Sequence, residues 1–202
     1  MPDQPDVVRR ARALLGRTIT GHGVTVRITE VEAYAGREDP ASHAFTRTPR
    51  SEIMYGPAYR LYVYRSYGIH FCANVVTGPA EIGAAVLLRA GEVVDGVDLA
   101  RLRRNAPAKD SQLARGPGNL AQALGITLDD LGTDLLGPSG EGVRLGPEAP
   151  AGGRVASGPR VGVSKAADVP WRFWIAGDPT VSAYRRSARA PSPGTTLSAR
   201  EH

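Results

Sequence analysis

Two glutamates interrupt the apolar face of a predicted strand that covers residues 23–34, GVTVRITEVEAY. Alternate residues of a strand share one face, and the first three on this face are aliphatic: Val24, Val26 and Ile28. If the alternation continues, Glu30 and Glu32 also point toward the core, where a carboxylate must be paired, protonated or beside a cleft. The alternative is a strand that bulges or ends near Thr29 and leaves both carboxylates in water.

Arg89 presents a matching puzzle at the end of a second apolar stretch, AAVLLR. A buried guanidinium needs an acidic partner, unless the strand simply reaches the surface there. A pair between Glu32 and Arg89 would satisfy both side chains. It would also keep the Glu32 carboxylate ionised beside a polar cleft, as a base that activates water requires.

The histidines and the single cysteine predict no metal centre. The four histidines show no metal-ligand spacing, and one cysteine can form neither a metal-binding cluster nor an intrachain disulfide,. Cys72 lies within an apolar strand, which is typical of a buried structural thiol. His43 is either an ordinary surface histidine or a functional one. We therefore expect neither a metal ion nor a cofactor.

The elements that must position these side chains predict one mixed α/β (α+β) domain. Helical periodicity and capping residues indicate helices over three segments: 7–16, 98–105 and 119–125,. Apolar or alternating stretches indicate strands over three segments after the first: 83–90, 160–164 and 171–177,. We expect a single compact domain over residues 1–185, with a largely antiparallel curved sheet flanked by helices, and a disordered tail over residues 186–202.

A β-hairpin is predicted at residues 61–76, LYVYRSYGIHFCANVV, with Tyr67 and Gly68 at its tip. A hairpin tip usually carries Asn, Asp, Gly or Pro, because these residues suit the turn. An aromatic residue at this place therefore calls for a function. The alternative is that Tyr67 is a surface tyrosine that packs on its own neighbours.

Composition and charge narrow the class of protein. The formal net charge is +5, and all but two of the 25 basic residues are arginines. This charge fits a polyanionic partner such as nucleic acid, although a genome rich in codons for Ala, Gly, Pro and Arg would give the same bias. No apolar run approaches the roughly 20 residues of a membrane helix. The N-terminus lacks a signal-peptide pattern, so we expect a cytoplasmic protein with no membrane partner.

Several long blocks of the chain together resemble the alkyladenine (3-methyladenine) DNA glycosylases, in a bacterial form. These blocks are EVEAYAGREDPASHAFTRTPR, LYVYRSYGIHFCANVV, VLLRA, RGPGNLAQALGI, RVGVS and WRFWI. The resemblance covers roughly residues 5–185 and rests on no single short motif. It implies a repair enzyme that inserts a β-hairpin into duplex DNA, flips an alkylated purine out of the helix and hydrolyses its N-glycosidic bond.

The resemblance also implies roles for individual residues. Glu32 matches the family's general base, and Arg89 matches the arginine that helps hold the attacking water. Five residues match the base pocket, the last through its backbone: Tyr34, His43, Tyr64, Asn74 and Val163. Tyr67 matches the tyrosine that intercalates into DNA. His70 departs from the family, in which an aromatic residue such as tyrosine is common at this place. This departure puts in question the DNA contacts beside Tyr67, the intercalating wedge.

Two further expectations concern DNA contacts and reaction type. The turn GPGN before residues 119–125 offers backbone N–H groups suited to a phosphate, so we consider Arg115, Gly118 and Asn119 as phosphate contacts, with an ordinary helix cap as the alternative. A lyase mechanism would need an amine nucleophile. Both lysines lie outside the blocks implied to build the pocket, and the N-terminal proline is more simply a frayed terminus. We therefore expect a monofunctional, monomeric enzyme of the nucleoid that leaves an abasic site in double-stranded DNA.

Two other functions fit parts of the sequence, and the hairpin loop can have two registers. A non-catalytic module that binds damaged or single-stranded nucleic acid would need no Glu32, and an enzyme acting on free nucleosides would not need Tyr67. A regular two-residue loop would place Tyr64 and Asn74 on opposite faces of the hairpin. Because the resemblance places both near one pocket, we predict an odd-residue loop or a bulge between them.

Overall fold

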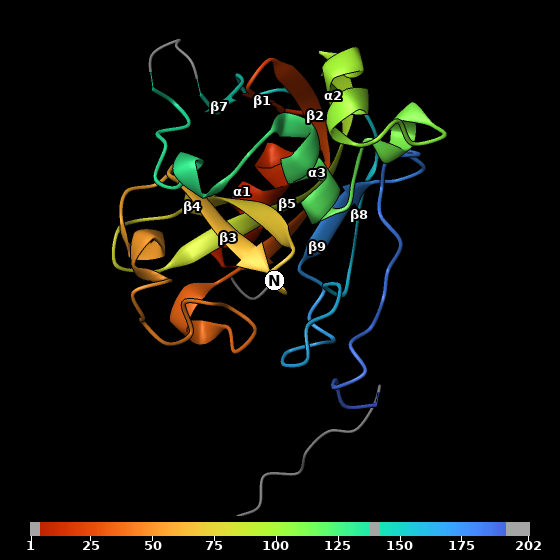
Figure 1. The fold of residues 1–202 in the computed structure, drawn as a ribbon. Coiled ribbons are helices and arrows are strands. Elements are labelled where there is room, and N and C mark those ends of the chain that lie inside the picture. Colours follow the sequence, from red (N-terminus) through yellow and green to blue (C-terminus); the bar gives the residue numbers. More distant parts are fainter. Residues whose placement is uncertain (1–4, 138–141, 193–202) are drawn as a thin grey trace, which may run out of the picture.

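A curled antiparallel sheet runs through residues 5–137 and 142–192, the part of the chain that the computed structural model describes (Figure 1). The described residues include three α-helices: α1 (Asp6–Leu14), α2 (Val97–Arg103) and α3 (Pro117–Leu124). They also include nine strands: β1 (Thr18–Gly21), β2 (Val24–Tyr34), β3 (Leu61–Ser66), β4 (His70–Thr77), β5 (Ala84–Asp95), β6 (Ala114–Arg115), β7 (Arg144–Leu145), β8 (Val155–Gly158) and β9 (Arg172–Ile175). The predicted mixed α+β fold is confirmed, while entry of a hairpin into DNA stays a prediction.

The sheet separates a hydrophobic core from a polar cavity. Its main strand order is β3-β4-β5-β2-β1-β7, and β9 pairs with β2 at Glu30–Glu32. Helices α1 and α3 lie against one face of the central strands (Figure 1), and the buried side chains of these helices and strands form the core. In β2, β3, β4 and β5, the residues that alternate with these core positions line the cavity on the other face,.

Two adjacent irregularities in the β2–β5 ladder decide where the charged side chains point. Ile28 pairs with Gly91 and Glu30 with Ala90, so Thr29 is an extra residue on β2; Val31 then pairs with Leu88, so Arg89 is an extra residue on β5. The extra residue on β2 moves its core positions from even to odd numbers,. The expectation that Glu30 and Glu32 continue the core face is therefore wrong, and the alternative of a bulge near Thr29 is right. Both side chains are nevertheless fully buried, not in water.

The predicted helices and most predicted strands are present with shifted ends, but the strand expected at 160–164 is wrong. This segment forms no ladder, because its polar groups bind elsewhere. The backbone N–H of Val161 donates to the Glu32 carboxylate, and that of Gly162 donates to the carbonyl of Arg185. The neighbouring β8 pairs with β9 instead.

β3 and β4 pair as an antiparallel hairpin with an odd-residue loop. Ser66 pairs with His70, which leaves three loop residues, and the N–H of Ile69 donates to the Ser66 carbonyl. Tyr67 and Gly68 both have positive φ, 49° and 68°, as the central residues of a type I′ turn require. Tyr64 pairs with Cys72, two positions from Asn74, so Tyr64 and Asn74 share a face. The predicted register is confirmed.

The division into a domain over 1–185 and a disordered tail over 186–202 stays a prediction. Residues 193–202 lie outside the described part of the chain, as do residues 1–4 and 138–141. Within the described part, no helix is both long and apolar enough to cross a bilayer.

Candidate active site

A cavity of about 680 Å³ lies on the face of the sheet opposite the hydrophobic core. Its lining comes from β2 to β5 and from the loops around residues 40–54 and 161–165. Eight residues with predicted roles in catalysis, in the base pocket or as the wedge all contribute to it: Glu32, Tyr34, His43, Tyr64, Tyr67, Asn74, Arg89 and Val163. The sheet thus brings together side chains that are far apart in the sequence.

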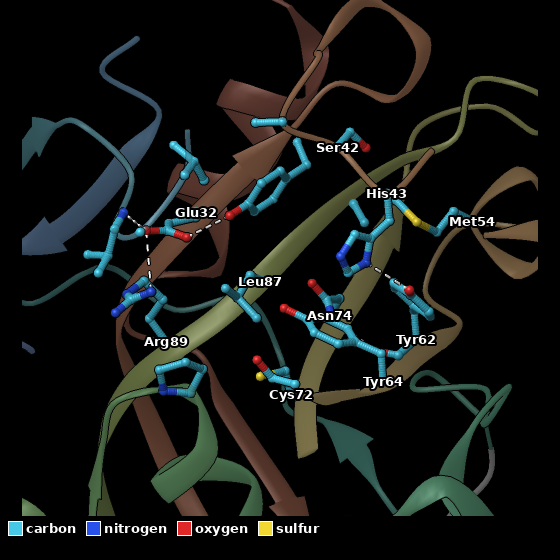
Figure 2. Close-up of a pocket in the computed structure, with 18 of the residues that line it drawn as sticks. Glu32, Ser42, His43, Met54, Tyr62, Tyr64, Cys72, Asn74, Leu87 and Arg89 are labelled. Atoms are coloured by element: carbon cyan, nitrogen blue, oxygen red, sulfur yellow. Dashed lines mark hydrogen bonds and ion pairs between the residues drawn. The ribbon is translucent and has the colours of Figure 1, made fainter. Parts of the chain in front are cut away.

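Glu32 forms the charged end of the cavity (Figure 2). Its carboxylate accepts hydrogen bonds from the Tyr34 hydroxyl at 2.9 Å and from the Val161 N–H at 2.7 Å, and Nη1 of Arg89 lies 3.4 Å from Oε1. Burial and the Glu32 charge raise the pKa of Tyr34 well above its usual value, so the hydroxyl stays a donor. A cation and two donors match an ionised carboxylate. The carboxylate is thereby fixed in place at the cavity wall.

Arg89 links Glu32 to a second buried carboxylate, Glu30. Nε of Arg89 donates to Glu30 at 3.0 Å, while Arg172 and Ser182 also bind Glu30, the latter through both N–H and hydroxyl. Burial disfavours the charged guanidinium, but Glu32 and Glu30 outweigh it and raise the pKa of Arg89. Arg89 is therefore a permanent cation held from two sides. Unlike Glu32, Glu30 does not line the cavity.

A second buried ion pair holds the loop that supplies the Val161 N–H. Arg160 donates from Nη2 to Asp39 at 2.9 Å and from Nη1 to the Ala33 carbonyl at 3.0 Å, and its guanidinium lies over the Tyr34 ring with Cζ 4.7 Å from the centroid. Both charged side chains are fully buried. Arg160 thus fixes two of the donors to Glu32, the Tyr34 hydroxyl and the Val161 N–H.

Three aromatic rings form the opposite end of the cavity (Figure 2). The His43 ring lies edge-on to Tyr64, with centroids 4.6 Å apart, and its Nδ1 is 2.9 Å from the Tyr62 hydroxyl. Burial of the ring among its neighbours and the charge of Arg50 lower the pKa of His43 to about 4. His43 is therefore neutral at physiological pH. Burial likewise raises the pKa of Tyr64, so this wall carries no charge of its own.

Asn74 and Cys72 occupy the floor between the two ends. The Asn74 amide donates to the Tyr62 carbonyl at 3.1 Å, which fixes its orientation. Burial raises the pKa of the Cys72 thiol, so the thiol stays protonated and is a poor nucleophile. Cys72 is buried, as its sequence context predicts.

The hairpin tip projects two apolar side chains into solvent. Tyr67 is 93% exposed and Ile69 is 70% exposed. An exposed aromatic residue at a tip that lines the same cavity fits a part that meets another molecule. The packing alternative for Tyr67 is disfavoured by this exposure.

The residues considered as phosphate contacts lie outside the cavity lining and bind within the protein. Nε of Arg115 donates to the Val181 carbonyl, and the Asn119 amide donates to the carbonyl of Arg115. A Cβ placed on Gly118 would lie 2.9 Å from Cβ of His70. Gly118 therefore allows α3 to approach the hairpin beside the position where this chain departs from the family pattern.

Sequence reasoning missed four residues at this site: Tyr62, Arg50, Val161 and Lys165. Tyr62 alternates with Tyr64 and could have been placed by strand periodicity, whereas the Val161 N–H belongs to a loop whose sequence pattern indicated a strand. Arg50 lies 5.0 Å from the Tyr64 ring centroid. Lys165 lines the cavity, which corrects the expectation that both lysines are remote from it. Among the described residues, no group of three acidic, His or Cys side chains could hold a metal ion.

Comparison with known proteins identifies the family. The family model described as "Methylpurine-DNA glycosylase (MPG)" matches residues 3–179. A "Putative 3-methyladenine DNA glycosylase" of Nocardia farcinica is 54% identical, covering 94% of this chain and 92% of that relative. Proteins with the same name from Mycobacterium bovis and Mycobacterium sp. (strain KMS) are 53% and 51% identical, and each pair covers at least 94% of both chains. The chain therefore belongs to the methylpurine-DNA glycosylase family.

Proposed function

We propose that the protein excises 3-methyladenine and related alkylated purines from double-stranded DNA, using a water molecule activated by Glu32 and leaving an abasic site. Family membership and the names of the relatives support the substrate class. The observation that carries the mechanism is Glu32, a fully buried carboxylate at a cavity wall that is held by Arg89, Tyr34 and Val161.

The reaction follows from the position of this carboxylate. Glu32 accepts a proton from water while the water oxygen bonds to C1′ of the flipped nucleotide, and the C1′–N bond breaks with its electron pair going to the base. An alkylated purine cation becomes neutral in this step, so it is a good leaving group. The same carboxylate stabilises the oxocarbenium-like sugar, as in glycoside hydrolysis. General-base assistance of this kind typically contributes about 10²–10⁴-fold.

The aromatic end of the cavity selects the base. Electron-rich ring faces attract a cationic purine more strongly than a neutral one, and Tyr64 at this end and Tyr34 beside Glu32 both line the cavity. Neutral His43 adds no repulsive charge. Asn74, fixed by its bond to Tyr62, screens the base edge that reaches the cavity floor.

The hairpin tip opens the duplex. Extruding a base costs a few kcal/mol of stacking and pairing, and the exposed Tyr67 ring fills the vacated stack and offsets part of that cost,. Arg115, Gly118 and Asn119 lie near the start of α3 and are assigned to the DNA backbone. Such a substrate places the enzyme at the nucleoid in the cytoplasm, where it acts as a monomer.

The decisive experiment measures abasic sites in duplex DNA that carries a single 3-methyladenine. Time-dependent abasic-site formation supports the proposal, and lesion binding without base release would favour a non-catalytic binding module instead. Release from free nucleosides alone would favour a nucleosidase. The same samples are treated with borohydride: because Lys165 is exposed rather than desolvated, as activated lysines are,, we expect no trapped covalent adduct. An adduct that disappears in Lys165→Gln would contradict the monofunctional mechanism.

A further inference from the structure

A second cavity, of about 140 Å³, lies on the other face of β4 from the candidate active site. Val75 and Thr77 line it, and they alternate along the strand with Asn74, which lines the first cavity,. The rest of its lining comes from α1 and from three loop residues: Arg17, Tyr59 and Glu148. No step of the proposed reaction uses this cavity.

Arg17 is a buried cation without a countercharge. It is only 5% exposed, and its Nε and Nη2 both donate to the single carbonyl oxygen of Gly146, at 3.1 and 2.6 Å. Within the described part of the chain, no carboxylate oxygen lies within 4.0 Å of its guanidinium. Removing an ion from water costs several kcal/mol unless an opposite charge compensates. Every other buried arginine of the described residues has such a carboxylate partner: Arg89, Arg160 and Arg172.

Two uncharged features of the same cavity also point to a ligand. Thr77 is only 4% exposed, and its buried hydroxyl has no hydrogen-bond partner among the described residues. Tyr59 has a φ of 64°, in the left-handed region that non-glycine residues rarely adopt,. Strained backbone of this kind gathers at ligand sites. An orphaned hydroxyl and an uncompensated guanidinium together suit an acceptor-rich anion.

The remaining charges set the size and charge of that anion. Arg9 and Arg10 also line the cavity, but both already bind the Asp6 carboxylate. Glu148 contributes one opposing carboxylate. Three guanidinium groups against two carboxylates leave an excess of about one positive charge. The volume is well below the roughly 300 Å³ at which small-molecule pockets usually begin, so the cavity suits a single oxyanion group better than a drug-sized ligand.

We propose that this second cavity binds one phosphate-type oxyanion, with Arg17 as its countercharge and the Thr77 hydroxyl as a further donor. The phosphate comes either from free inorganic phosphate or from the backbone of a nucleic acid strand that passes this face. In both cases the ligand supplies the negative charge that Arg17 lacks.

The first test measures thermal unfolding of the whole protein in inorganic phosphate and in chloride at matched ionic strength. Phosphate should raise the midpoint of the wild type and should do so less in the variants. Because hydrogen bonds to charged groups are strong, Arg17→Gln should bind phosphate about tenfold more weakly or worse, and Thr77→Val about threefold more weakly. Glu148→Gln removes the opposing charge and should bind it more tightly. The uncharged Thr77→Val variant decides the matter if Arg17→Gln does not fold.

The second test measures binding of undamaged duplex DNA as a function of salt concentration. If a backbone phosphate occupies the cavity, the slope of log K against log salt should fall by about one in Arg17→Gln. An unchanged slope together with stabilisation by phosphate identifies the free ion as the ligand. Base release should stay normal in Arg17→Gln and Thr77→Val, since neither Arg17 nor Thr77 lines the first cavity. Absence of both effects, or equal effects in wild type and variants, would overturn the proposal.

Discussion

The two ends of the candidate active site are held by different forces (Figure 2). At the charged end, Glu32, Arg89 and Tyr34 are fixed by ion pairs and hydrogen bonds on strands of the central sheet. At the aromatic end, His43 and Tyr64 meet through ring contacts, and neither carries a charge at neutral pH. Under the proposed function, the charged end performs the chemistry and the uncharged rings receive the base, with Arg50 as the cation beside them.

Glu30 and Glu32 sharpen this comparison within the charged end. Both are fully buried carboxylates on β2, two residues apart. Glu30 accepts bonds from Arg89, Arg172 and Ser182 and has no access to the cavity. Glu32 accepts two hydrogen bonds, against four at Glu30, and lines the cavity. Of the two buried carboxylates, only Glu32 faces the cavity, and this is why we propose it as the base and Glu30 as its support.

The largest effect is expected from Glu32→Gln. An amide cannot accept the proton from water, so single-turnover release of 3-methyladenine should fall by at least about 10²–10⁴-fold. Lesion binding should be retained, because the aromatic end is unchanged. Release measured beside equilibrium binding to the same duplex checks both parts. Near-normal release of 3-methyladenine by Glu32→Gln would show that Glu32 is not the base.

A smaller effect on rate is expected from Glu30→Gln. Breaking a buried ion pair from one side typically costs about 3–5 kcal/mol of stability, and a looser Arg89 should lower the rate of base release about tenfold while lesion affinity stays the same. Denaturant unfolding, release rates and binding are measured on the folded variant. Rescue by Glu30→Asp of the rate as well as the stability would identify a positioning role.

Asp178→Asn is the matched control for this variant. Asp178 pairs with Arg27 and lies outside the cavity, so the change should cost stability and leave the release rate unaltered. A similar loss of rate in Asp178→Asn would mean that Glu30 acts only through general stability.

The contrast between Glu30 and Glu32 also marks the limit of sequence reasoning. Alternation along β2 and the apolar run before Arg89 led to the predicted pair of Glu32 with Arg89, and the pair is present although Glu32 does not continue the core face. They could not show the extra residue at Thr29, whose hydroxyl lies 2.7 Å from that of Thr180. That contact is between residues far apart in the sequence, and it is tertiary structure, not local propensity, that sets the bulge.

The aromatic end and its loops show the same limit. The hairpin register followed from two premises together: side chains alternate along paired strands, and the family resemblance places Tyr64 and Asn74 near one pocket,. The segment 160–164 looked like a strand because Val161 and Val163 alternate, but its N–H groups bind a carboxylate and a distant carbonyl in place of a ladder. Where backbone groups bind side chains from elsewhere, periodicity gives a wrong answer.

Tyr67→Ala tests whether recognition depends on opening the duplex. Loss of one stacking ring is worth about 1–3 kcal/mol, so we expect roughly tenfold weaker capture of a lesion in duplex DNA. Capture from a single strand should change less, since less unstacking is required. The ratio of the two affinities is the measurement. Equal losses on both substrates would assign Tyr67 to packing and not to base flipping.

The smallest effect is expected from protonation of His43 at the aromatic end. Its pKa is lowered from 6.5 to about 4, first by burial and then by Arg50, so the folded state favours the neutral ring. The stability that this gives is fully present above about pH 6.5 and is lost as the pH falls toward 4. Below that pH the ring is a cation beside Arg50 and beside any cationic base.

Lesion affinity should therefore be flat from pH 8 to 6 and should fall by a few-fold as the pH approaches 4, because like charges repel at short range. His43→Gln keeps a polar side chain of similar size but cannot ionise, so its affinity should lose this dependence on pH. Binding of the catalytically inactive Glu32→Gln protein, with and without His43→Gln, measures the effect without turnover. A fall in affinity at acid pH that is the same in both proteins would mean that another group titrates. A fall confined to the protein that retains His43 would show that the aromatic end binds its base only while His43 is uncharged.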